Sequence, residues 1–300
     1  MPVFSRPKVA LSLTKADEQL LPYTALLARW MGWEAVDFAH IVPPDRHTQA
    51  WDPKPWEDRL QDEVRRMFGP PPPPCRANFH VVRGSRIDQM IGLAVEHERD
   101  LIVLGHRRMR SGRRSLARRL AMLAPCSVWL VPEDSPPVVA NILVPIDFSS
   151  HSADSLATAV AIARAGGLSS LRTVHVFFDP SSIRYDEHVD EILGQEESAF
   201  ETFLAGVDTQ GVRVEPIFQE STHPAEAILR LAENCGSDLI VMSTRGRSHA
   251  ASVLLGSVTS QTMSATKIPL LAVKHYGSKL TLLEALLNHR IWETEPPKTN

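Results

Sequence analysis

The sequence predicts an α/β protein in which two similar halves each form a mostly parallel β-sheet covered by helices. Two observations lead to this prediction. Short aliphatic runs alternate with longer segments of helical periodicity, which is typical of right-handed βαβ crossovers. The run Asp-Leu-Ile-Val at residues 100–103 also recurs at residues 238–241, an offset of 138 positions (238 − 100), with similar segments before and after it. A divergent tandem duplication explains both observations.

The second half shows the alternation clearly. Ala153, Leu156, Val160 and Ala163 lie on one face of a helix. The glycines at 166–167 are suited to end that helix. We expect strands at 141–146, 171–178, 212–218, 238–242 and 269–273. We expect helices at 152–165 and 184–207, a third that begins at about 223, and a fourth that ends at about 265. The first half follows the same order more loosely.

Length and composition agree with this fold. The 300 residues suit two domains of ordinary size, and 43% hydrophobic and 22% charged residues are typical of a globular chain. The net charge of −3 argues against a globally basic nucleic-acid binder. No apolar run approaches the roughly 18 residues of a membrane span, and the apolar stretch near the start is too short for a secretory signal. We therefore expect a cytoplasmic protein with no membrane segment.

The expected domains are residues 1–133 and 139–276, separated by an acidic, proline-containing linker. The tail, residues 277–300, places Leu280, Leu283 and Leu287 on one helical face. We expect it to form an amphipathic helix that packs on the body or on a second subunit, since its flanks are not strongly basic. The five prolines at 70–74 predict a stiff polyproline II connector, with a ligand for a partner domain as the alternative.

Asp147 directly follows the first strand of the second half. Ligands of open parallel sheets bind at the carboxyl ends of the strands, where this carboxylate could accept hydrogen bonds from a ribose or a base. Asp147 could equally cap the next helix, a role that Ser149 or Ser150 could also fill. Both interpretations stay open at this stage.

The loop after the fourth strand of the second half has the character of a phosphate cradle. Gly246 allows close approach of a ligand to the backbone, and Gly256-Ser257 opens a helix whose free N–H groups can hold anionic oxygens. Arg245 or Arg247 could add charge. Each residue alone is explained by turn chemistry. The nine residues between Gly246 and Gly256 form a more specific pattern when Asp147 is included.

These segments resemble the universal stress protein family. The resemblance is carried by Ile-Leu-Val-Pro-Ile-Asp-Phe-Ser at residues 142–149, by His175-Val176, and by Ser243-x-x-Gly246-x9-Gly256-Ser257. It extends over both halves and points to the tandem type of the family. It implies two Rossmann-like five-stranded parallel α/β sandwiches of the adenine nucleotide alpha hydrolase-like type, paired through their last strands. Many members bind ATP.

By this resemblance, Asp147 contacts the ribose or the adenine, the backbone of Val176 holds the adenine, and the residues around Gly256 hold the phosphates. The site so implied consists of Pro145, Ile146, Asp147, Val176, Met242, Ser243, Arg245, Gly246, Gly256, Ser257 and Val258. The expected ligand is ATP with Mg²⁺, with AMP or ADP as alternatives.

The sequence departs from the family pattern in both halves. Ser243 replaces the first motif glycine, which matters if that position needs a positive φ, although its hydroxyl could instead donate to a phosphate. The first half is more divergent: Thr14 is aligned with Asp147, Gly105 with Ser243, Arg108 with Gly246, and either Arg114 or Arg118 with Gly256. We infer that the first half lost the nucleotide cradle and that the second kept most of it.

Other motifs narrow the function. Arginines cluster at 107–119. In a chain of net negative charge, we favour a solvated helix face paired with acidic residues elsewhere over a site for an anion, RNA or an acidic partner. No aromatic residues lie between the arginines, as base stacking on RNA would require. The sequence lacks a P-loop, a GxSxG elbow and an HExxH or HxxxH pair, so no metal site and no catalytic residue are assigned. The three cysteines, Cys75, Cys126 and Cys235, are too scattered for a disulfide framework.

We therefore expect a nucleotide-dependent sensor or regulator in the stress response, with at most slow ATP hydrolysis. A slow ATPase of the same fold and an interaction module without nucleotide are the alternatives. The two halves are expected to form an internal pseudo-dimer, and two chains could pair again as a homodimer.

Overall fold

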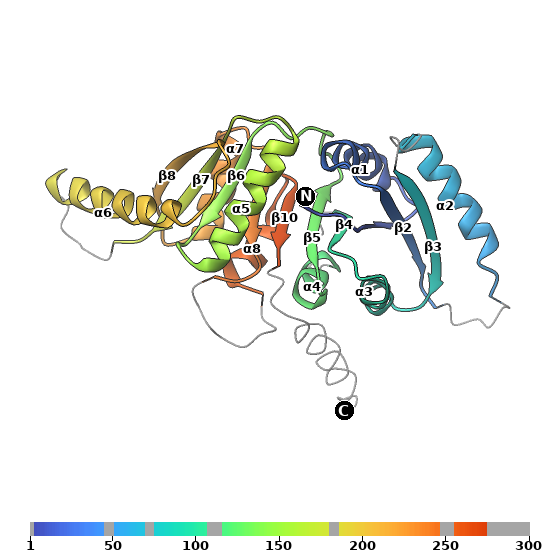
Figure 1. Ribbon diagram of the computed structural model, residues 1–300. Helices are drawn as coiled ribbons and strands as arrows, with labels where there is room; N and C mark the ends of the chain where they lie inside the picture. The colour runs from blue at the N-terminus through green and yellow to red at the C-terminus, as the bar shows by residue number, and fades with distance from the viewer. Residues whose placement is uncertain are drawn as a thin grey trace, which may run out of the picture.

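The computed structural model describes residues 3–44, 51–69, 75–106, 116–179, 186–246 and 255–274, which form the α/β architecture that the sequence predicts (Figure 1). The elements of the first half are β1 (Pro7–Leu11), α1 (Asp17–Met31), β2 (Ala35–Val42), α2 (Lys54–Met67), β3 (Arg76–Arg83), α3 (Arg86–Glu96), β4 (Leu101–His106), α4 (Leu116–Leu123) and β5 (Ser127–Pro132). The second half repeats the order with β6 (Ile142–Ile146), α5 (Ser150–Ala165), β7 (Ser170–Phe177), α6 (Asp186–Ala205), β8 (Arg213–Glu220), α7 (Pro224–Asn234), β9 (Leu239–Ser243), α8 (Ser257–Ala265) and β10 (Leu270–Val273).

Three expected features lie outside the described residues. They are the polyproline segment 70–74, the greater part of the arginine cluster at 107–115, and the tail from residue 275 onward. Across the described ranges, no helix is long and apolar enough to cross a membrane.

The strands form one ten-stranded sheet in the order β3-β2-β1-β4-β5-β10-β9-β6-β7-β8. Neighbouring strands are parallel within each half. At the centre, β5 and β10 pair antiparallel, with Trp129 opposite Leu271. This is the pairing through the last strands that the family resemblance implies. Because the direction of the strands reverses at this pair, the carboxyl ends of the two halves lie at opposite edges of the sheet.

The core lies on both faces of the sheet, and successive strand residues alternate between the faces. Val9 and Phe38 belong to the apolar cluster that includes residues of α1, α2 and α5. Ala39 and Ile102 belong to the cluster that includes residues of α3, α4 and α7. Burial on both faces explains why the strands are continuous hydrophobic runs.

The two halves also contact each other through side chains. Trp30 of α1 packs over Gly166, which follows α5, so closely that a Cβ added to Gly166 would lie 2.2 Å from the indole ring. Lys274, after β10, donates from Nζ to the carbonyls of Met122 and Ala124 at the end of α4. A cation at a helix C-terminus also complements the helix dipole.

The structure corrects the alignment of the two halves near their first strands. The expected alignment of Thr14 with Asp147 implies an offset of 133 positions (147 − 14), but β1 and β6 correspond at 135 (142 − 7). Leu13 and Phe148, which are 135 positions apart, share an unusual positive φ of 55° and 59°. Ser12 therefore stands at the position of Asp147, and the expected alignment with Thr14 was wrong. A slip of two residues preserves the alternation of faces along a strand, so hydrophobicity alone did not detect it.

Candidate functional site

Asp147 shapes the turn that links β6 to α5. Its Oδ1 accepts hydrogen bonds from the backbone N–H of Ser149, at 3.1 Å, and from the Ser149 hydroxyl. Ser149 is the N-cap of α5, and its Oγ accepts a hydrogen bond from the N–H of Ser152. Of the alternatives left open by the sequence, Ser149 thus caps the helix. The Asp147 carboxylate is held at the carboxyl end of β6 instead.

The loop after β9 is held by bonds at both of its ends. Ser243 is the last residue of β9, and its hydroxyl donates to the carbonyl of Arg245. The carbonyl of Ser243 accepts from Thr259 Oγ1 at 2.8 Å, and the N–H of Gly256 donates to the Thr244 carbonyl at 2.9 Å. Ser243 does not have a positive φ. Serine is therefore compatible with the backbone at the first motif position.

The two loops meet because β6 and β9 are neighbours in the sheet. A Cβ added to Gly246 would lie only 2.7 Å from Oδ2 of Asp147. Because glycine has no Cβ, position 246 leaves room for the carboxylate of Asp147. The structure thus brings Asp147 and Gly246 together, although they are 99 positions apart in the sequence (246 − 147).

The N-terminus of α8 faces the same edge of the sheet. Gly256 is its N-cap, and no side chain of the described residues caps the helix. Ser257 is exposed and Val258 is half-buried. A Cβ on Gly256 would meet its nearest atoms at 3.6 and 3.7 Å, which is ordinary contact. Unlike Gly246, this glycine is not required by the described residues around it, which do not include 247–254.

Val176 lies on β7, on the other side of β6, one residue before the strand ends. The preceding His175 is buried, bonds through Nδ1 to the carbonyl of Ile146 at 2.9 Å and stacks on Phe148. The remaining predicted residues, Pro145, Ile146, Met242 and Arg245, lie at the ends of β6 and β9. The predicted site residues therefore lie at the carboxyl ends of three neighbouring strands and at the start of α8.

The first half differs at the equivalent edge. Asp17, which corresponds to Ser152, accepts hydrogen bonds from the N–H groups of Ser12 and Leu13 at 3.2 and 2.6 Å. Burial raises the pKa of Asp17, and these bonds oppose that shift. The buried carboxylate of Asp17 therefore stabilises the turn after β1 through hydrogen bonds to its backbone. Arg118 is the third residue of α4, whereas Arg108 and Arg114 fall outside the described residues.

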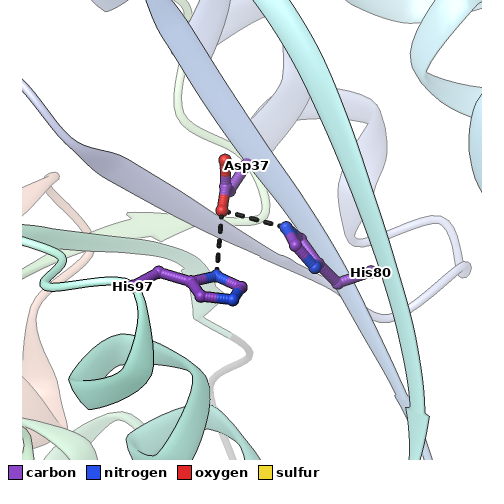
Figure 2. A group of neighbouring side chains, drawn as sticks. All are labelled: Asp37, His80 and His97. Atoms are coloured by element: carbon purple, nitrogen blue, oxygen red, sulfur yellow. Dashed lines mark hydrogen bonds and ion pairs between the residues drawn. The ribbon is translucent and has the colours of Figure 1, made fainter.

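The sequence did not reveal a second polar centre, which consists of Lys8, Asp37, Asn78, His80, His97 and Arg99 and is called the Asp37 centre below. Asp37 of β2 is 1% exposed. Its Oδ2 lies 2.9 Å from His80 Nε2 and 3.4 Å from His97 Nδ1 (Figure 2). The same oxygen lies 3.0 Å from Arg99 Nη2 and 3.5 Å from Lys8 Nζ, and Asn78 donates to Oδ1 at 2.9 Å.

The electrostatics of the Asp37 centre favour an ion-pair network over a metal site. Burial alone raises the pKa of Asp37, but the bonds from His80 and Asn78, with the charges of Arg99 and Lys8, outweigh burial and hold that pKa well below its usual range. Asp37, His80 and His97 present possible ligand atoms within 4.8 Å of one another. However, two cations already contact the carboxylate oxygen that a metal would need, and they would repel it.

One signal in the sequence could have revealed this centre. Lys8 and Asp37 stand at inward-facing positions of continuous apolar strands, where a charged residue needs a partner. Finding their partners required the fold, because His80 and His97 come from different elements.

With the geometry established, comparison with known proteins identifies the family. The universal stress protein family model matches residues 139–274. A universal stress protein of Thermus aquaticus is 32% identical over 135 residues, which cover 98% of that protein and 45% of this chain. The chain belongs to the universal stress protein family.

Solved structures extend the similarity of fold to both halves of this universal stress protein. A universal stress protein from Archaeoglobus fulgidus aligns over 91% of this chain and 97% of its own, with a TM-score of 0.64 and 16% identity. A Pseudomonas aeruginosa protein described as functionally unknown aligns over 97% and 98%, with a TM-score of 0.65 and 15% identity. At such identities the likeness concerns the fold alone, and it supports the tandem arrangement.

Proposed function

We propose that the second half of this universal stress protein binds an adenine nucleotide, ATP with Mg²⁺, at the carboxyl ends of β6, β7 and β9. The observation that carries the proposal is the meeting of the Asp147 and Gly246 loops beside the start of α8, whose first turn no described side chain caps. A helix N-terminus with free N–H groups attracts phosphate oxygens. The carboxylate nearby can accept hydrogen bonds from a ribose.

The two motif glycines support the proposal in different ways. Gly246 is explained by the carboxylate of Asp147, which occupies the space of its missing side chain. Gly256 has no positive φ and, among the described residues, has room for a Cβ, so these residues alone do not require glycine there. A phosphate lying against the backbone of Gly256 supplies the reason, and the exposed Ser257 next to it can donate its hydroxyl.

Membership of the family supports a role in the stress response. We propose that the protein acts in the cytoplasm as a nucleotide-dependent sensor or regulator, with at most slow hydrolysis. Asp147 is already engaged with Ser149 and lies, in this proposal, toward the ribose rather than the γ-phosphate. Mg²⁺ would be held mainly by the phosphate oxygens, as is usual for nucleotide-bound magnesium.

Isothermal titration of ATP into the full chain tests the site. Gly256→Arg places a long side chain across the start of α8 without a clash at its Cβ, so we expect ATP binding to be lost while the fold remains. Gly246→Ala should weaken binding by displacing Asp147. Gly194→Ala is the matched control, since no neighbouring atom of the described residues would lie within 4 Å of the added Cβ, and it should bind like wild type. Unchanged binding in Gly256→Arg refutes the site.

Two further measurements separate the alternatives. Mass spectrometry of the purified protein detects a co-purified nucleotide, and the absence of both co-purification and titratable binding would favour an interaction module. A multiple-turnover phosphate-release assay identifies a true ATPase by turnover that is lost in Gly256→Arg. Native mass spectrometry determines whether two chains form the homodimer that we also propose.

A further inference from the structure

Phe178 is an exposed aromatic residue beside the proposed nucleotide site. It comes directly after β7 and two residues after Val176. Its exposed fraction of 58% is the largest among the exposed large hydrophobic residues in the described ranges. Within these ranges its ring belongs to neither apolar cluster and makes no contact with another aromatic ring. A single exposed apolar residue is ordinary on a protein surface, so the case for Phe178 depends on where it lies.

β7 extends beyond β6 at this edge of the sheet. Ile146, the last residue of β6, pairs with His175 of β7. By the same register, Val176 is level with Asp147, and Phe178 lies two residues farther out, or roughly 7 Å along the strand direction. Phe178 therefore lies past the end of β6, at the carboxyl edge that the proposed site occupies.

The backbone of Val176 faces the side on which β6 has ended. The carbonyl of Phe177 accepts a hydrogen bond from the N–H of Ser221 at 2.9 Å, so the backbone groups of Phe177 face β8. In a parallel sheet the N–H and C=O of one residue point to the same side of the strand, and successive residues alternate between the two sides. Val176 therefore presents its N–H and C=O toward the Asp147 turn, where a base can pair with them.

The first half has no aromatic residue at the position of Phe178. His40 and His175 correspond at the offset of 135, because each bonds through Nδ1 to a carbonyl of the first strand in its half, at 2.9 Å in both cases. Phe178 therefore corresponds to Pro43 (178 − 135). The exposed ring is present in the half that keeps the glycine motif and absent from the half that has lost it, so the fold itself does not require it.

We propose that Phe178 forms one wall of the adenine pocket and stacks on the base of the nucleotide held between Val176 and the Asp147 turn. The inference rests on the proposed function and assigns part of the recognition of the base to a residue outside the glycine motif. Side chains alternate between the faces of a strand, so continuing β7 places Phe178 on the same face as Val176. The ring thus contributes contact to the base and none to the phosphates.

Isothermal titration of the full chain with ATP, ADP and AMP tests this assignment. We expect Phe178→Ala to weaken binding roughly 5-fold to 150-fold, the range found when one base loses its aromatic stacking partner. The factor should be the same for all three nucleotides, because stacking does not involve the phosphates. Phe178→Trp, which keeps an aromatic face, should bind within about twofold of wild type.

Val138→Ala is the matched control. Val138 is also an exposed apolar residue, at 46%, but it precedes β6 and so lies at the opposite edge of the sheet from the proposed site. It should bind all three nucleotides like wild type. Replacement of an exposed side chain should leave the fold intact, and circular dichroism of each variant checks this.

Proton NMR of the bound nucleotide supplies a readout that a merely structural role would not change. We expect nuclear Overhauser effects between adenine H2 or H8 and aromatic protons of the protein, and their loss in Phe178→Leu, which keeps an apolar side chain without a ring. Wild-type binding of ATP that Phe178→Ala leaves unchanged, or a loss that grows with the number of phosphates, overturns the role of Phe178 alone. Failure of the wild-type chain to bind any of the three nucleotides overturns the proposed function, and this assignment with it.

Discussion

Gly166 provides a direct test of how the two halves are held together. It follows α5 with φ −85° and ψ 0°, a conformation that any residue adopts. A Cβ at this position would lie 2.2 Å from Cζ3 of Trp30, whereas carbon atoms in contact are about 3.5–4.0 Å apart. In Gly166→Ala the indole ring must therefore move by roughly 1.5 Å, which disturbs the packing of α1 against α5.

We expect Gly166→Ala to lower the free energy of unfolding by about 1–3 kcal/mol, the usual cost of overpacking. Denaturant unfolding of the full chain measures this change. In a Trp30→Ala background the same substitution should cost almost nothing, because the ring that opposes the methyl group is gone. The resulting coupling energy should fall within the roughly 0.5–3 kcal/mol found for residues in contact.

Gly194→Ala on α6 is the matched control. In the described part of the chain, no neighbouring atom would lie within 4 Å of its added Cβ, so it should be neutral or stabilise the protein by up to about 1 kcal/mol through helix propensity. The steric argument is refuted if Gly166→Ala costs less than about 0.5 kcal/mol, the level of an ordinary surface substitution, or if Trp30→Ala does not relieve the cost.

Two further predictions concern buried charges. Asp37→Asn should destabilise the protein by about 3–5 kcal/mol because it leaves the buried Lys8 and the half-buried Arg99 without this counter-charge. Lys8→Leu, which copies Leu143 of the other half, should cost far less in the same unfolding assay, and similar losses in the two variants would contradict this asymmetry. Burial lowers the pKa of Lys274 from 10.5 to about 8, so between these values the unfolded chain binds more protons and stability should rise with pH, by at most roughly 1.4 kcal/mol per pH unit from this lysine. Unfolding measured from about pH 8 to about pH 10 should show a shallower rise in Lys274→Met, and an unchanged slope would show that Lys274 is not the group responsible.

Much of the fold could be predicted from the sequence, because hydrophobic periodicity is a local property. The strands and helices of the second half lie within a few residues of their expected positions. The repeated residues Asp100 and Asp238 also make equivalent hydrogen bonds, each to the backbone just before the first strand of its half. Asp100 accepts from the N–H groups of Ser5 and Arg6, and Asp238 from those of Ala140 and Asn141. The alignment of β1 with β6 failed by two residues because such a slip leaves the inward and outward faces unchanged.

The candidate nucleotide site was predictable for a different reason. Its residues follow strands whose carboxyl ends must meet in a parallel sheet, so the sequence alone predicts that Asp147 and Gly246 lie close together. Only the structure shows that a Cβ at position 246 would lie 2.7 Å from Oδ2 of Asp147. The assignment of the N-cap also required it, since Asp147, Ser149 and Ser150 are all suitable by residue type.

Composition, periodicity and internal repetition were sufficient to establish two α/β halves, their likeness, and the half that retains the glycine motif, because these depend on residues close together in the chain. The tertiary structure alone showed that Lys8, Asp37, His80 and His97 form one buried centre and that Trp30 packs over Gly166. These contacts join residues far apart in the sequence. Their energies depend on burial and on distances of a few ångströms, and neither quantity is encoded in any local pattern of residue types.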